Sequence, residues 1–121
     1  MPQNPPRNTE LYDQVPDRSR LEVRVGAAGA PFTSEAKFFT SAELAQEWTD
    51  GDLRPGPKLV QLRAGKAYFL SVRLKFQAQT AATIDVQIRK PNGTSHSTPI
   101  HWDVNGTANG NAVRGLFVQM A

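Results

Sequence analysis

Cysteine is absent from the 121-residue sequence, and there are only two histidines. The lack of cysteine excludes disulfide bonds, thiolate metal sites and a cysteine nucleophile, although it is compatible with any compartment. Zinc sites in proteins use three or four nitrogen or sulfur ligands, which His96 and His101 alone do not supply. Asp50 and Asp52 could offer oxygen ligands to calcium, but they do not match the calcium-loop pattern. We therefore expect neither a metal site nor a cofactor.

Long apolar runs are also absent. No segment approaches the roughly 18 to 20 consecutive apolar residues of a transmembrane helix. The N-terminal segment MPQNPPRNTELYDQ lacks the apolar core of a signal peptide. These features predict a soluble chain with neither a membrane span nor a signal peptide, and they leave its localisation open.

A strong charge of one sign is missing as well. The formal net charge is +3, which is too small to favour disorder. The lysines and arginines are spread along the chain, whereas nucleic-acid-binding domains usually concentrate them on one face. The charge pattern therefore argues against nucleic acid as a partner.

Alternation of apolar and polar residues is the dominant pattern, and it is clearest in the segments 68–76 and 84–88. A period of two is typical of strands with one buried face. Two such runs a few residues apart predict a β-hairpin. In its expected register, either Arg73 or Lys75 lies opposite Asp85 on the outer face.

Shorter alternating segments predict further strands. Residues 97–104 and 112–120 flank a polar loop and predict a second hairpin. Other strands are expected at 20–25, 36–39 and 58–63. Six to eight strands over about 100 residues, separated by turn signals, predict an all-β fold of the antiparallel β-sandwich or jelly-roll type. We expect one such domain over residues 19–121.

The only helical signal covers residues 41–49. Thr40 or Ser41 could cap the N-terminus of a helix, and Leu44 and Trp48 would lie one turn apart on one face. We expect one short helix that depends on packing these two side chains against the sheet.

Residues 1–18 hold four of the nine prolines and show no periodic pattern. This composition predicts a flexible, Pro-rich N-terminal arm. An alternative is an arm that becomes ordered on a neighbouring subunit, with Leu11, Tyr12 and Val15 as its anchors.

His101 and Asp103 are the best candidates for catalysis. Two residues apart on a predicted strand, they share one face at a separation of about 7 Å. A nucleophilic mechanism requires a third partner, such as Ser95 or Ser97, and the spacing supports none. We interpret the pair as the solvent-facing side of an amphipathic strand, and we predict that the protein is not an enzyme.

The loops offer one hypothesis for function, because loops on a rigid β-sandwich commonly carry binding sites. A non-catalytic module would recognise a glycan or a protein surface there, with Trp48 as the aromatic platform for a sugar ring. The candidate ligand-binding residues are Trp48, Asp50, Asp52, Asn92, His96, Asn105 and Asn109.

Outward aromatic residues offer a second hypothesis. Phe69 and Phe117 are out of phase with their buried neighbours and should point away from the core. Outward phenylalanines on two strands indicate either a contact with another protein or a covering layer, such as the predicted helix or arm. Tyr12, Phe69, Arg73 and Phe117 are therefore candidates for a protein interface. On this hypothesis the chain is a self-assembling structural protein, for example a component of a particle, and forms a homo-oligomer.

Overall fold

The computed structural model describes residues 7–41 and 43–121. It consists of two packed β-sheets and one short helix, which confirms the predicted all-β sandwich. The described residues form nine strands, one more than the upper limit of the prediction. Their bounds, with that of the helix, are β1 (Thr9–Val15), β2 (Arg20–Gly26), β3 (Phe32–Thr40), β4 (Glu43–Trp48), α1 (Asp50–Leu53), β5 (Lys58–Gln61), β6 (Ala67–Phe76), β7 (Thr80–Arg89), β8 (Ile100–Gly106) and β9 (Asn111–Met120).

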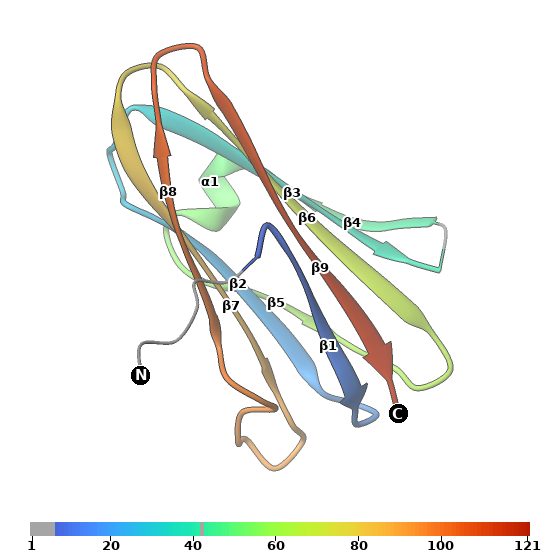
Figure 1. The fold of residues 1–121 in the computed structure, drawn as a ribbon. Coiled ribbons are helices and arrows are strands. Elements are labelled where there is room, and N and C mark those ends of the chain that lie inside the picture. The colour runs from blue at the N-terminus through green and yellow to red at the C-terminus, as the bar shows by residue number, and fades with distance from the viewer. Residues whose placement is uncertain (1–6, 42) are drawn as a thin grey trace.

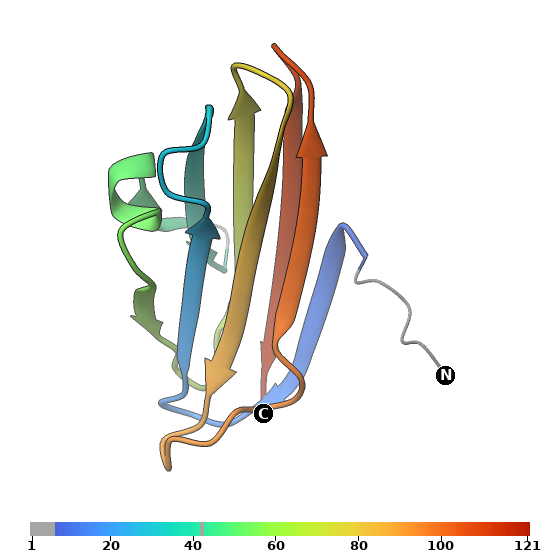
Figure 2. The same cartoon turned by 90° about the vertical axis from the view of Figure 1, so that its left-hand side faces the viewer.

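The two sheets have the orders β1-β9-β6-β3-β4 and β5-β2-β7-β8. Neighbouring strands are antiparallel except for β1 and β9, which run parallel. Figure 1 shows the five-stranded sheet crossing the molecule, with the second sheet packed against it. In the turned view, β1 lies at one edge of the sandwich and α1 at the other (Figure 2).

The core lies between the sheets and contains the inward residue of each alternating pair. In β6 these residues are Tyr68, Leu70, Val72, Leu74 and Phe76, and all five are buried. In β7 they are Ala82, Ile84, Val86 and Ile88. The hydrophobic effect of burying one face of each sheet therefore stabilises the packing of the two layers.

Both predicted hairpins are wrong. β6 belongs to the five-stranded sheet and β7 to the four-stranded sheet, and β8 and β9 are divided in the same way. Each connection therefore crosses from one layer to the other. Asp85 lies opposite Arg24 and His101, not opposite a residue of β6. Alternation reveals that a strand has a buried face, but it does not identify the neighbouring strand.

The predicted helix at 41–49 is also wrong, because Glu43–Trp48 forms strand β4 beside β3. A spacing of four residues places two side chains on one face in a strand as well as in a helix. Here a β-bulge intervenes, since Phe38 pairs with Gln46 and Phe39 with Leu44. The extra residue turns Leu44 outward, while Trp48 faces the core.

The described helix, α1, is a single turn that follows β4. The Oδ2 atom of Asp52 accepts hydrogen bonds from the main-chain N–H of Thr49 at 2.8 Å and from its hydroxyl at 3.1 Å. Leu53 is the buried residue of this turn.

The predicted flexible arm at 1–18 is wrong for residues 9–15, which form β1 and pair with β9. Tyr12 and Val15 are buried in the core. The tyrosine hydroxyl donates to the carbonyl oxygen of Thr98 at 2.7 Å, and Trp102 Nε1 donates to that of Arg7 at 2.6 Å. Apolar burial and these bonds to β8 and to the β7–β8 loop outweigh the low strand propensity of the segment. Residues 1–6 of the predicted arm lie outside the described residues.

Candidate functional site

A row of five apolar side chains crosses the outer face of the five-stranded sheet. The residues are direct neighbours from strand to strand, so that every strand contributes one of them. In the order of the strands β1, β9, β6, β3 and β4, they are Leu11, Phe117, Phe69, Phe39 and Leu44. We call this set the aromatic row.

The aromatic row is a continuous apolar surface. The ring centroids of Phe69 and Phe117 are 4.5 Å apart, and those of Phe39 and Phe69 are 6.3 Å apart. Leu11, Phe117 and Leu44 are 54%, 50% and 50% exposed, whereas Phe39 and Phe69 are only partly exposed. The row therefore protrudes at Phe117 and is lower at Phe39.

A glycine next to the row shapes this surface. Gly115 lies on β9 beside Phe117, and a Cβ atom at this position would lie 3.0 Å from the ring of Phe69. Because glycine carries no side chain, the Phe69 ring can lean across β9 and reach Phe117.

Charged residues flank the aromatic row on one side. Lys37 pairs with Glu47 across β3 and β4, and Arg73 lies opposite Glu35 across β6 and β3. Both signs of charge are thus interspersed next to the row. Arg73, an interface candidate from the sequence, lies four residues along β6 from Phe69 on the same face.

The outer face of the four-stranded sheet is polar. Glu22 accepts hydrogen bonds from Gln87 Nε2 at 2.6 Å and from Arg89 Nε at 3.0 Å. A concavity of about 320 Å³ lies between β2 and β7, and its polar lining includes Arg24 and Asp85. Its remaining lining residues are Glu22, Val23, Pro57, Val86, Gln87 and Pro99.

His101 lies at the edge of this polar face, between two carboxylates. Its Nδ1 atom is 2.5 Å from Asp85 Oδ1, and its Nε2 atom is 3.0 Å from Asp103 Oδ1. The hydrogen bond with Asp85 raises the pKa of His101 above its ordinary value, partial burial opposes this, and Asp103 adds to the increase. Both ring nitrogens face a carboxylate, so the protonated imidazole can donate both N–H groups and link β7 to β8. In that state the ring has no lone pair with which to act as a base.

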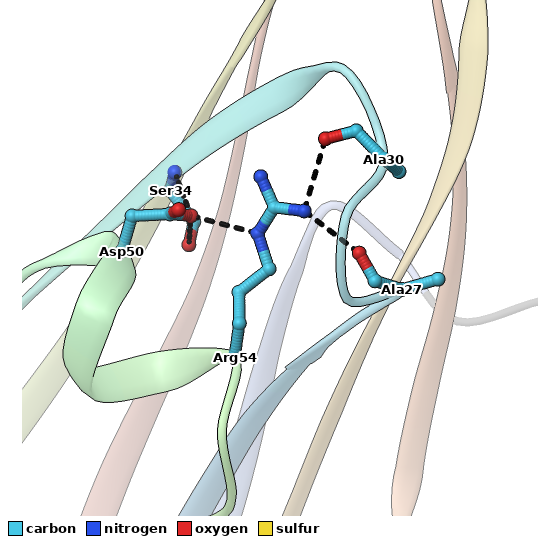
Figure 3. Close-up of polar contacts among 5 residues, drawn as sticks. All are labelled: Ala27, Ala30, Ser34, Asp50 and Arg54. Carbon is cyan, nitrogen blue, oxygen red and sulfur yellow. Dashed lines mark hydrogen bonds and ion pairs between the residues drawn. The ribbon is translucent and has the colours of Figure 1, made fainter.

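Asp50 and Arg54 form a third polar cluster, shown in Figure 3. Asp50 Oδ1 accepts from the main-chain N–H and the hydroxyl of Ser34 at 2.8 and 2.7 Å, and from Arg54 Nε at 2.8 Å. Arg54 Nη1 donates to the carbonyl oxygens of Ala27 and Ala30 at 2.7 and 3.1 Å. The cluster therefore fixes α1 to β3 and to the β2–β3 loop.

The loop candidates do not gather into one site. Asn92 and His96 lie in the β7–β8 loop, whereas Asn105 and Asn109 lie at the other end of β8 (Figure 1). Asn92 Oδ1 accepts from the main-chain N–H and the hydroxyl of Thr94 within its own turn. His96 Nε2 lies 2.8 Å from the carbonyl oxygen of Asp13 and thus links this loop to β1.

Two further candidates are built into the fold. Trp48 was expected to be an exposed platform, but it is 5% exposed and packs beside Phe38 at 6.4 Å between ring centroids. Tyr12 was expected at an interface, but it is also 5% exposed. Burial raises the pKa of Tyr12 to about 12, and the charge of Glu10 adds to this effect. Neither side chain is available to a partner.

Phe69 and Phe117 point outward, as the sequence predicted. Neither β1 nor β4 covers them, because both strands extend the same sheet at its edges. Sequence reasoning missed Phe39 and Leu44, and it named Leu11 only as an anchor of the N-terminal arm. The adjacent pair Phe38 and Phe39 was a usable signal, since two neighbouring residues of a strand cannot both face the core.

No family model, curated protein or solved structure matches this chain. Within residues 7–41 and 43–121, no helix is both long and apolar enough to cross a membrane. The same residues contain no group of three or more His, Asp or Glu side chains that could hold a metal ion.

Proposed function

We propose that this chain is a non-catalytic structural protein that associates with copies of itself through the outer face of its five-stranded sheet. The aromatic row is the observation that carries this proposal. Monomeric proteins rarely expose contiguous apolar surface that extends across a whole face, and such surfaces commonly mark contacts with other proteins.

The dimensions of the sheet support a contact between two sheets. Five strands about 4.8 Å apart, with up to about 30 Å of each strand exposed, offer roughly 700 Å² on each copy. A stable protein interface buries about 800 Å² on each partner. Two such faces can pack directly at a separation of about 10 Å, as the two layers of a sandwich do.

The composition of the face supports the same function. The three phenylalanines lie on the three inner strands β9, β6 and β3, and aromatic residues are enriched in the cores of interfaces. Lys37, Glu47, Glu35 and Arg73 lie on one side of them, and charged and polar residues of this kind form the rims of most interfaces. The mixture of both signs gives two copies no strong net repulsion.

The test compares two leucines that differ only in the face they occupy. Leu44 on edge strand β4 is 50% exposed beside the aromatic row, and Leu59 on edge strand β5 is 49% exposed on the opposite sheet. Light scattering after size-exclusion chromatography should give the native chain a mass above the 13.3-kDa subunit mass. We expect Leu44→Ser to lower that mass and Leu59→Ser to leave it unchanged.

A native chain that stays at the subunit mass over the accessible concentration range would overturn the proposal. An equal effect of Leu44→Ser and Leu59→Ser would also overturn it, because the contact would then not be specific to this face.

The concavity lined by β2 and β7, which combines apolar side chains with Arg24 and Asp85, favours a second candidate function, the binding of a polyhydroxylated ligand such as a glycan. Its volume of about 320 Å³ lies within the range of ligand sites, about 300–1,000 Å³. Arg24 supplies donors and Asp85 an acceptor, which suits hydroxyl groups that both donate and accept. Titration calorimetry against a panel of oligosaccharides should show binding that Arg24→Ala weakens, and the absence of heat with every sugar would reject this function.

A further inference from the structure

We infer that the contact is a closed dimer whose two-fold axis runs along β6 and passes over Phe69. This inference rests on the proposed function, and it specifies which residues of the two copies meet. In this arrangement β1 of one copy faces β4 of the other, and β9 faces β3. Each Leu11 therefore packs on the partner's Leu44, and each Phe117 packs on the partner's Phe39.

The composition of the aromatic row allows this pairing. Read across the sheet, its residues are Leu, Phe, Phe, Phe and Leu, so that the row has the same sequence of residue types from either end. A two-fold interface places one surface against itself and requires it to be self-complementary. Rotation about an axis at the central Phe69 places leucine on leucine and phenylalanine on phenylalanine.

The difference in exposure between Phe117 and Phe39 favours the axis along β6. Phe117 is 50% exposed and Phe39 is less exposed, so the rotation sets a protruding ring against a lower one. The other possible in-plane axis runs along the row itself. It would place Phe117 on the second copy's Phe117 and Phe39 on the second copy's Phe39. The two more exposed rings would then meet each other and leave a gap between the two less exposed rings. Close-packed interfaces favour the first arrangement.

A closed dimer also follows from this symmetry. An isologous contact uses the same face on both copies, and that face is then fully occupied. Association through this sheet therefore stops at two copies.

The decisive experiment mixes two charged variants, Leu11→Lys and Leu44→Glu. Both positions are about half exposed on edge strands, so that each variant should fold, which circular dichroism and thermal unfolding verify. Each variant alone places a charge against an apolar side chain and should dissociate. Mixed in equal amounts, they form a heterodimer with Lys opposite Glu at one end and the native leucine pair at the other. We expect its dissociation constant to be at least roughly tenfold below that of either variant alone.

Chemical cross-linking gives an independent readout, because a cysteine-free chain reacts only at introduced thiols. With a short bis-maleimide, Leu11→Cys mixed with Leu44→Cys should yield a covalent dimer, and neither variant should do so alone. A covalent dimer of Leu11→Cys alone, together with no gain on mixing the charged variants, would overturn the axis along β6 while self-association itself remains. A native chain without any dimer would overturn the proposed function as well.

Discussion

Replacement of Arg54 by methionine tests how α1 is fixed to the sandwich. Methionine keeps an unbranched apolar stem, but it removes the guanidinium group. The change deletes the hydrogen bonds to Asp50, Ala27 and Ala30, and it removes the cation that lies 3.7 Å from the centroid of the Phe32 ring. The side chain of Arg54 is only 10% exposed, so that water replaces these contacts poorly.

The expected cost can be assembled from these contacts. A hydrogen bond to a charged group contributes about 1.5–3 kcal/mol, and a cation over an aromatic ring contributes about 0.5–1 kcal/mol. The contacts share one side chain and do not add fully. We expect Arg54→Met to lower the free energy of unfolding by about 3 kcal/mol, which corresponds to roughly 10 °C in Tm for a domain of this size.

Urea and thermal unfolding at one fixed protein concentration measure this loss. Arg63→Met is the matched control, since Arg63 is exposed and its guanidinium makes no hydrogen bond or ion pair with the described residues. A surface change of this kind should cost less than about 0.5 kcal/mol. A double-mutant cycle with Asp50→Asn should return a coupling energy of about 1–2 kcal/mol. A loss for Arg54→Met no larger than that of the control would refute this account of the cluster.

Three further changes test separate parts of the fold. His101 has a raised pKa in the folded state, so its stabilising effect is complete below pH 6.5 and is lost as the pH rises through the raised value. His101→Gln should remove this decline in the free energy of unfolding, as measured by urea titrations at several pH values. Gly106→Ala would drive a methyl group into the ring of Phe76 and should cost about 1–3 kcal/mol, whereas Gly56→Ala, with open space around it, should have little effect on Tm. Tyr12→Phe loses a hydrogen bond to the β7–β8 loop and should cost about 1 kcal/mol; an unchanged Tm would show that this bond does not hold β1.

The layers of the fold could be predicted from the sequence, but the neighbours of each strand could not. Alternation in β6 and β7 records that each has one buried face, and both strands lie where the pattern placed them. The same pattern arises whether two strands pair edge to edge or face each other across the core. β6 and β7 do the latter, so the predicted hairpin and the register derived from it were wrong.

The candidate surface was predictable only in part, for the same reason. Phe69 and Phe117 were identified as outward because each interrupts the alternation of its own strand. Leu44 was assigned to a helix, since the bulge in β4 that turns it outward has no signature in the sequence. Leu11 lies in a segment whose prolines suggested an arm. Recognition of the aromatic row requires the register of four strand pairs, which sequence patterns alone do not supply.

The parallel pairing of β1 with β9 sets the order in which the surface is completed during synthesis. About a hundred residues separate the two strands, and ribosomes add roughly 5–20 residues per second. For several seconds, therefore, Leu11 on the nascent chain has no strand beside it, and Phe117 does not yet exist. Contacts between strands so distant in sequence also form slowly. The aromatic row is thus completed only after β9 has been synthesised, so an unfinished chain does not yet present the five-residue surface.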